Sequence, residues 1–267
     1  MSKPLFRFTV GPCIPQGLEV LKESVKKTTA TLGIDAFDWM ICHNGLSEDE
    51  QAQLSDMTKD LPIVLYEQSW NFVPIPDDQE WATPKRKDGS FEWNGNHCGG
   101  TLWKVCPARM RMESHEIVMD NDIVLLEKFP QIDHFLKSTH MALILEEPIK
   151  FYGRYDAQFG DKEPYLNSGF IGFPPGYDYG AEILRVWEET GSFQKLSHSD
   201  EQGLLMYTLS RLPSVRIKKH QMVELLATDV DASKRLTGKE AGLHFTQANR
   251  IPNHLSWKKY KEIMSNE

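Results

Sequence analysis

No part of the sequence approaches the roughly 18 consecutive apolar residues of a membrane-spanning helix. The first residues, MSKPLFRFTV, lack the apolar segment behind basic residues that marks a secretory signal peptide. Cysteine is scarce: the chain has only Cys13, Cys42, Cys98 and Cys106. They show no Cys-x-x-Cys spacing, and no pair of histidines lies at zinc-finger distance from them. These absences predict a cytoplasmic protein with no membrane span, no structural zinc site, and free or buried thiols.

Basic residues are scattered, apart from Lys85-Arg86-Lys87, and acidic residues outnumber them. With a net charge of -8, the sequence lacks the broad basic face that a nucleic-acid-binding protein needs. Its 267 residues, 40% hydrophobic and 25% charged, suit a globular protein with a large core. We find no internal repeat and no boundary between domains, so a single domain is expected over residues 1–267.

The first part of the chain alternates strand patterns with helical ones. Strands are predicted in LFRFTV, FDWMICHNG and PIVLY, and a helix in PQGLEVLKESVKK, where apolar residues recur on one face. Ser47 and Glu50 form a capping box for a second helix that runs to about Met57. This order predicts an α/β fold with a mixed, mainly parallel central sheet, flanked by helices, and with ligand sites at the carboxyl ends of its strands.

The later elements are shorter and separated by one long irregular segment. Residues 69–100 are rich in Pro, Gly, Asn and Trp, and so long a connection is usually functional or partly folded. Pro107 is expected to end or bend the helix that follows in TLWKVCPARM. Further strands are predicted in EIVMDNDIVLL, MALILE, YLNSGFIGF and near Val215, Val223 and Leu243, and further helices in IDHFLK, YGAEILRVWEE, DEQGLLMYTLSRL and WKKYKEIM.

Asp120-Asn121-Asp122 interrupts an apolar strand pattern in HEIVMDNDIVLLEKF. A buried carboxylate is costly unless it is paired or bound to a metal, so either a loop breaks the strand here or an ion binds. Two nearby carboxylates suit Mg²⁺ or Mn²⁺, which also bind diphosphates. An Asx turn is the alternative for 120–122, and the preferred interpretation of the second Asp-x-Asp, 229–231, which lies in a polar, loop-like stretch.

Several segments occur in the order in which they are found in GT-A glycosyltransferases. NGNHCGGTLWKVCPARM through EIVMDNDIVLLEKF resembles the centre of glycosyltransferase family 8, with Lys104, Pro107, Asp120 and Asp122 at the positions of its basic helix residue, final proline and metal-binding Asp-x-Asp. YLNSGFIGF resembles the Asn-Ser-Gly strand of the family, SDEQGLLMYTL its acidic helix start, and GLHFTQANR the strand whose histidine completes the metal site. FDWMICHNGLSEDEQAQL resembles its second strand, so the ordered series covers most of the chain.

The resemblance implies a Rossmann-like GT-A fold, with a nucleotide-binding half in 1–126 and an acceptor-side half with a C-terminal helix in 127–267. It also implies a metal-dependent enzyme that moves a hexose from a nucleotide-diphosphate sugar, in particular a UDP-sugar, to a glycan or other hydroxyl acceptor. Asp120, Asp122 and His244 would bind Mn²⁺ or Mg²⁺. The implied donor contacts are Thr9, Val10, Gly11, Asn44, Lys104, Asn121, Ser168, Gly169 and Arg250, and the implied catalytic residues are Asn167, Asp200 and Glu201.

Each of these assignments has a plainer alternative. His244 would serve equally as a satisfied core histidine, and Gly169 as a residue that relieves crowding in a central strand. Asp200 and Glu201 would stabilise the start of a helix, where Ser199 and Gln202 form a capping box. The functional interpretation makes one of the two acids a hydrogen-bond partner of the sugar or the base for an acceptor hydroxyl.

Two other functions remain open at this stage. After His244 the family has Gly and then Lys-Pro-Trp, whereas this sequence has 246–252, TQANRIP, where Arg250 would replace the lysine. That departure motivates a non-catalytic GT-A-like module that binds a nucleotide or sugar without turnover. Paired aspartates also occur in metal-dependent phosphohydrolases and nucleotidyl transferases, although the dehalogenase-type phosphatases carry theirs on the first strand.

Overall fold

The structure is a computed structural model of the chain. It describes residues 2–11, 13–43, 46–67, 104, 109–147, 149–160, 165–190, 198–227, 229–236, 240–249 and 251–266. The predicted irregular segment 69–100, residues 101–103 and 105–108 of the predicted helix TLWKVCPARM, and the predicted donor contacts Asn44 and Arg250 lie outside these residues. In the described part, no helix combines the length and apolar character needed to cross a bilayer.

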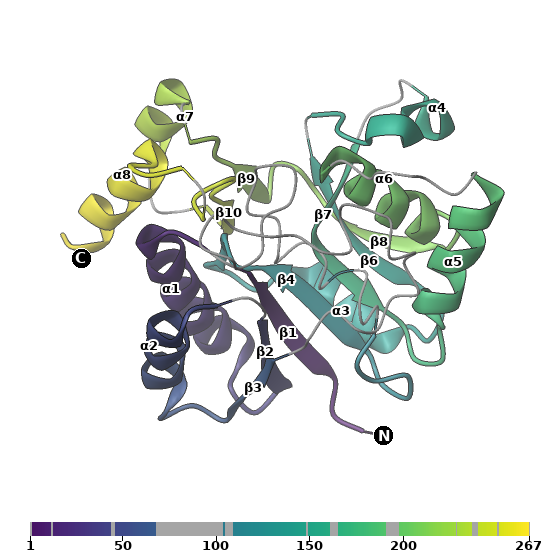
Figure 1. The fold of residues 1–267 in the computed structure, drawn as a ribbon, viewed down its shortest axis with the longest axis horizontal. Helices are drawn as coiled ribbons and strands as arrows, with labels where there is room; N and C mark the ends of the chain where they lie inside the picture. The colour runs from purple at the N-terminus through teal and green to yellow at the C-terminus, as the bar shows by residue number, and fades with distance from the viewer. Residues whose placement is uncertain are drawn as a thin grey trace.

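A seven-stranded sheet forms the centre of the fold (Figure 1), in the order β3-β2-β1-β4-β7-β6-β8. Strands β3, β2, β1 and β4 are parallel, and β7 runs antiparallel to both β4 and β6. This confirms the predicted α/β fold with a mixed, mainly parallel sheet. The strands are β1 Leu5–Val10, β2 Asp38–His43, β3 Ile63–Glu67, β4 Glu116–Asp120, β6 Ala142–Glu147, β7 Tyr165–Phe173 and β8 Ser214–Ile217.

The antiparallel direction of β7 brings distant residues to one edge of this sheet. Strands β1, β2, β4 and β6 all end at that edge, whereas β7 begins there. The last residue of β4, Asp120, therefore lies beside the first part of β7, which contains Asn167-Ser168-Gly169. In α/β sheets, ligands bind at the carboxyl ends of the parallel strands, so a ligand site is expected at this edge.

EIVMDNDIVLL does not form one strand. It forms β4, a turn at Asn121–Asp122, and β5 Ile123–Leu125, which belongs to a second sheet with β9 Met222–Glu224 and β10 Gly242–His244. Strand β10 pairs antiparallel with β5 and places His244 opposite Ile123. The acidic interruption of the apolar pattern is thus the point where the chain passes from one sheet to the other.

Two apolar cores cover the two faces of the large sheet. Successive residues of β4 face opposite sides, so Ile117 and Met119 pack into one core and Val118 into the other. The first core includes apolar residues of α1 Pro15–Leu32, α2 Glu48–Thr58 and α3 Pro130–Lys137. The second includes residues of α5 Tyr179–Glu189 and α6 His198–Leu209, next to a 3₁₀ turn at Gly153–Tyr155 and the short α4 Asp156–Phe159.

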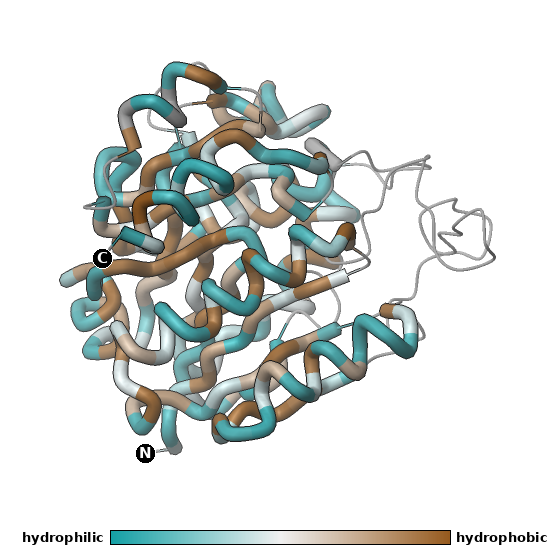
Figure 2. The backbone as a smooth tube through the Cα atoms, turned by 90° about the vertical axis from the view of Figure 1, so that its left-hand side faces the viewer, coloured by the Kyte–Doolittle hydropathy of each residue, from teal (hydrophilic) through white to brown (hydrophobic). Residues whose placement is uncertain are grey.

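Figure 2 shows hydrophobic and hydrophilic stretches alternating along the surface helices, as expected when one side of each helix packs on the sheet. The predicted capping box of α2 is confirmed, because Glu50 N donates to Ser47 Oγ at 3.3 Å and Ser47 N donates to Glu50 Oε2 at 2.7 Å. The side chain of Ser199, where a second cap was predicted, lies outside the described residues, and Gln202 of that pattern donates to Glu147 Oε1 at 2.6 Å. Residues 230–235 form a short helix, α7 Val230–Arg235, where a loop was expected.

The C-terminal helix α8, Leu255–Met264, packs on α1 through polar contacts and a third apolar cluster. Trp257 Nε1 donates to Glu19 Oε2 at 3.3 Å, and the Tyr260 hydroxyl donates to Glu23 Oε1 at 3.0 Å. The fully buried His254 caps the helix: its Nδ1 accepts from Trp257 N at 3.4 Å, and its Nε2 lies 3.0 Å from the carbonyl oxygen of Leu225.

Burial lowers the pKa of His254, because a charged imidazolium would lose its hydration. We expect the contribution of His254 to the free energy of unfolding to fall as the pH drops below about 6.5, where the unfolded chain takes up a proton that the folded protein resists. Urea unfolding at several pH values between 5 and 8 should show this loss. In His254→Asn, the asparagine side chain can still accept the capping hydrogen bond but does not titrate. The difference in free energy of unfolding between the wild type and His254→Asn should therefore shrink as the pH falls. A difference that is constant with pH would contradict the prediction.

Candidate metal and donor site

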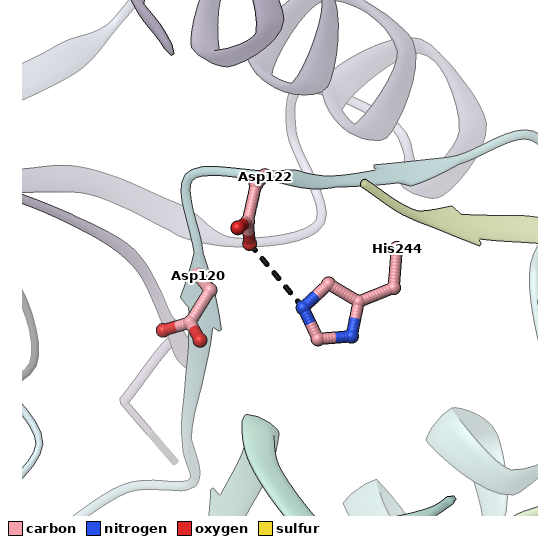
Figure 3. A group of neighbouring side chains, drawn as sticks. All are labelled: Asp120, Asp122 and His244. Carbon is pink, nitrogen blue, oxygen red and sulfur yellow. Dashed lines mark ion pairs between the residues drawn. The ribbon is translucent and has the colours of Figure 1, made fainter. Parts of the chain in front are cut away.

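Two acidic side chains and one imidazole converge at the carboxyl edge of the large sheet (Figure 3). Asp120 ends β4, Asp122 lies in the turn before β5, and His244 ends β10. One ligand atom from each residue lies within 4.8 Å of the others. His244 Nε2 is 3.4 Å from Asp122 Oδ1, and both side chains are nearly buried. The arrangement provides two carboxylates, which are ligands that Mn²⁺ and Mg²⁺ favour, and one imidazole nitrogen.

Backbone pairing holds these three residues in place. Thr9 pairs with Asp120 in the β1–β4 register, and its hydroxyl lies 3.4 Å from Asp120 Oδ1. On the other side of the turn, Phe245 N donates to the carbonyl oxygen of Asp122 at 2.8 Å. The turn is therefore tied to both sheets, and the separation of Asp122 from His244 is set by hydrogen bonds that do not involve their side chains.

Lys104 supplies a buried positive charge next to the acidic pair. Its ammonium donates to Asp120 Oδ2 at 2.8 Å and to Ser168 Oγ at 3.2 Å, and its side chain is only 3% exposed. Burial alone would lower the pKa of Lys104, but the charges of Asp120, Glu201 and Asp122 raise it above its ordinary value. The lysine predicted from the sequence is thus placed among the acids of the site.

The pKa of His244 reports the same concentration of negative charge. Burial opposes protonation of the ring, but Asp122, Glu224 and Asp120 overcome this effect and raise the pKa to about 9. Several carboxylates thus share a small and largely buried volume. Such a volume is electrostatically favourable for a divalent cation.

The first part of β7 approaches the acidic pair with its backbone. A Cβ atom at Gly169 would lie 3.2 Å from Asp120 Oδ2 and 2.7 Å from Asn167 Oδ1, so a larger residue would crowd both side chains. Ser168 is 2% exposed and contacts Lys104, as described above. Asn167 is also buried, and its amide makes hydrogen bonds within the protein, to Glu147 and to Gly169 N.

Asp200 and Glu201 both lie in the first turn of α6 and are buried. Asp200 Oδ1 accepts from Arg154 N at 2.8 Å, and Arg154 Nε is 3.3 Å from Asp200 Oδ2. Gly153 has φ +56°, and a Cβ there would lie 2.2 Å from Asp200 Oδ1, so the turn fits closely over this acid. Asp200 is therefore bound to residues 153–154, whereas the charge of Glu201 acts on Lys104.

The other predicted donor contacts lie along the same edge. Thr9, Val10 and Gly11 are buried at the end of β1. Asn121, between the two acids, is 5% exposed, and its Nδ2 has no hydrogen-bond partner among the residues that the structure describes. His43 ends the neighbouring strand β2, opposite Val10, and burial lowers its pKa.

Sequence reasoning missed two further polar residues of this edge, Glu147 and Gln202. Glu147 ends β6, and its carboxylate binds the side-chain amides of Asn167 and Gln202 at 2.6 Å each. The signal was present in the sequence, because Glu146 and Glu147 follow the apolar strand pattern MALIL as Asp120 follows EIVM. The sequence pattern predicts only a capping role for Gln202, whereas its amide is buried and bonds to Glu147.

Comparison with solved structures shows the same fold over nearly the whole chain. The galactosyltransferase LgtC, solved with donor and acceptor sugar analogues, matches with a TM-score of 0.59 at 12% identity, over 98% of this chain and 95% of that one. Mouse xyloside xylosyltransferase 1 matches with a TM-score of 0.53 at 11% identity, over 94% of this chain and 100% of that one. The glycosyltransferase GlyE of Streptococcus pneumoniae matches with a TM-score of 0.54 at 11% identity, over 100% of this chain and 63% of that one.

In sequence, no protein-family model and no curated protein matches the chain. At identities of 11–12%, the structural similarity establishes the fold of this chain but not a reaction that it catalyses. The shared architecture is the mixed, mainly parallel sheet with helices on both faces, over almost the full length of the chain. This chain therefore has the GT-A fold of the family-8-like glycosyltransferases that its sequence resembles.

Proposed function

We propose that the protein is a metal-dependent glycosyltransferase that moves a hexose from a nucleotide-diphosphate sugar, in particular a UDP-sugar, to a hydroxyl group of a glycan or another acceptor. One observation carries the proposal. Asp120, Asp122 and His244 come from two different sheets and converge on one point at the carboxyl edge of a GT-A fold. Asx-turn or core-histidine roles would not require the three to meet.

The side chains present fit a hard divalent cation. Asp120, Asp122 and His244 would hold Mn²⁺ or Mg²⁺, since carboxylate oxygens suit both ions and imidazole is also a ligand for Mn²⁺. When bound, such a cation would neutralise the negative charge that develops on the departing nucleotide diphosphate. Lys104, whose ammonium lies 2.8 Å from Asp120 Oδ2, would add a second positive charge on the same side.

The position of each half of the chain suggests how the substrates are divided. The edge of β1, β2 and β4 in residues 1–126 would bind the nucleotide, with Thr9, Val10, Gly11 and Asn121 along it. Residues 127–267 contribute the start of β7 and of α6, where Ser168, Gly169 and Glu201 would face the sugar and the acceptor. Either Asp200 or Glu201 would accept a hydrogen bond from the sugar or activate the acceptor hydroxyl.

Thermal unfolding with UDP and Mn²⁺ tests the binding part of this proposal. At a ligand concentration of about 100 times Kd, binding to the folded state alone adds about 2.7 kcal/mol, which should raise Tm by about 5–10 °C. UDP with EDTA and Mn²⁺ alone are the controls, and each should give a smaller shift than the pair. A protein that responds to no nucleotide diphosphate with metal would contradict the proposal.

A panel of nucleotide sugars with Mn²⁺, read by release of free sugar, then separates the functional alternatives. Sugar release from one donor, or transfer to an added glycan, would support the transferase. Tight UDP binding without turnover on any donor or acceptor would favour the non-catalytic module. Release of phosphate or pyrophosphate without free sugar would favour the phosphohydrolase or nucleotidyl transferase.

A further inference from the structure

A buried carboxylate outside the acidic pair organises the sugar side of the candidate site. Glu147, at the end of β6, is 5% exposed and uses both of its oxygens. Its Oε2 accepts from Asn167 Nδ2 at 2.6 Å, and its Oε1 accepts from Gln202 Nε2 at 2.6 Å. One carboxylate therefore joins the start of β7 to the N-terminal part of α6.

The other contacts of the two amides fix their orientation. Asn167 Oδ1 accepts from Gly169 N at 2.5 Å, so its Nδ2 must face Glu147. Gln202 Nε2 also donates to the carbonyl oxygen of Phe151 at 3.3 Å, and Gln202 Oε1 accepts from Ser168 Oγ at 3.4 Å. Neither amide can flip without placing an oxygen against Glu147.

The same hydrogen bonds lead from Gln202 to the acidic pair. Ser168, which donates to Gln202, accepts from Lys104 Nζ at 3.2 Å, and Lys104 donates to Asp120 Oδ2 at 2.8 Å. Every bond in this series has a donor facing an acceptor. Burial raises the pKa of Glu147 to about 8, and the two amide donors act against that rise. The carboxylate that accepts from both amides is therefore the main form above pH 8, and the variants below are compared at that pH.

We propose that Glu147 is a positioning residue of this site. It fixes the amides of Asn167 and Gln202 and, through Gln202 and Ser168, the place of the Lys104 ammonium beside Asp120. The inference rests on the proposed function, because the position of Lys104 matters for turnover only if a leaving phosphate binds there. It predicts an effect on kcat, since the nucleotide and metal contacts at Asp120, Asp122 and His244 do not include Glu147.

Glu147→Gln is the central test, because it preserves the volume and changes one acceptor into a donor. The new amide group must face the amide of Asn167 or Gln202, so one of the two hydrogen bonds becomes a contact between donors. Adding Asn167→Asp to Glu147→Gln restores a donor facing an acceptor at this contact, with the two roles exchanged. The new carboxylate at 167 keeps its bond from Gly169 N and accepts from the new amide at 147, whose oxygen still accepts from Gln202.

Glu146→Gln is the matched control. Glu146 precedes Glu147 in β6 and is also 5% exposed, but it is paired with Lys218 at 2.8 Å and has no part in the series of hydrogen bonds. It therefore reports the effect of removing a buried acidic charge from the same strand. Its kcat should stay close to that of the wild type.

We expect Glu147→Gln and Asn167→Asp each to lower Tm by about 5 °C, and the double variant to lose less than either one. With a donor that the wild type hydrolyses or transfers, Glu147→Gln should lower kcat by about 10- to 100-fold, with KM changed by less than about 2-fold. The double variant should regain most of kcat. Recovery in both measurements is specific to the paired bonds, because a general loss of stability would not be reversed by a second substitution.

Two outcomes would overturn the inference. One is strictly additive losses of Tm in the double variant, which can be measured whether or not the wild type shows turnover. The other is an unchanged kcat in Glu147→Gln on a donor that the wild type uses. Failure of the proposed function is a separate result, because it would appear in the wild type itself as no response to any nucleotide diphosphate with Mn²⁺.

Discussion

Asp122→Asn should lower metal-dependent turnover by at least about 100-fold and abolish the added thermal stabilisation by UDP with Mn²⁺. Asparagine has the shape of aspartate without its charge, so the site would lose one of two carboxylates at the point where Asp120, Asp122 and His244 meet. This loss of a carboxylate weakens the attraction of the site for a divalent cation.

The chain provides a control for this experiment in its second Asp-x-Asp. Asp231 lies in the first turn of α7, its side chain is 78% exposed, and it is 3.6 Å from Lys234. Asp231→Asn makes the same chemical change at an exposed position and should leave turnover and the UDP–Mn²⁺ shift unaltered. Turnover should be measured as a function of Mn²⁺ concentration. A full metal response in Asp122→Asn would refute its assignment as a ligand.

Glu116→Gln should destabilise the protein by about 3–5 kcal/mol, which corresponds to a fall in Tm of about 10 °C. Glu116 and Arg7 are completely buried, and Arg7 Nε lies 2.7 Å from Glu116 Oε1. The other oxygen, Oε2, accepts from Met110 N at 2.9 Å and Arg111 N at 3.0 Å, and Arg109 Nε is 3.8 Å away. A glutamine can satisfy the backbone donors with its oxygen only by turning its amide group towards Arg7.

The cost therefore arises from removing the charge of Glu116 beside the buried guanidinium of Arg7, and thermal or urea unfolding will measure it. Asp56→Asn is the matched control, because Asp56 is also paired with a cation, Lys59 at 2.8 Å, but at an exposed position. Removal of that charge should leave Tm nearly unchanged, since solvent screens exposed pairs. Equal changes in Tm for Glu116→Gln and Asp56→Asn would show that the buried pair does not stabilise the sheet.

The elements that could be predicted were those whose signals are local. Apolar periodicity indicated the strands and helices of the sheet, and Ser47 with Glu50 marked the start of α2. The ordered motifs pointed to the GT-A fold and to Asp120, Asp122 and His244 before their proximity was known. A chain of hydrogen bonds through Glu147 and Gln202 could not be predicted in this way, because its members are 55 residues apart and meet only when β6 and α6 pack together.

Two further differences have physical reasons of the same kind. The run EIVMDNDIVLL is apolar on both sides of its acids because β4 and β5 are both buried, and burial does not reveal that they belong to different sheets. The pattern at 199–202 suggested a cap, whereas the side chain of Gln202 turns inwards to Glu147 and to the carbonyl oxygen of Phe151. In both cases tertiary contacts decided between local structures that the sequence permits equally.

The C-terminal helix α8 is connected to the proposed cation site through His244, which lies in the second, smaller sheet. His244 ends β10, and the next residue, Phe245, packs against Trp257 and Tyr260 of α8, which in turn bind Glu19 and Glu23 of α1. A cation held by Asp120, Asp122 and His244 would bridge the two sheets and so favour the docked position of α8. By thermodynamic reciprocity, the factor by which a bound ion favours the docked position of α8 is also the factor by which docking of α8 raises affinity for the ion.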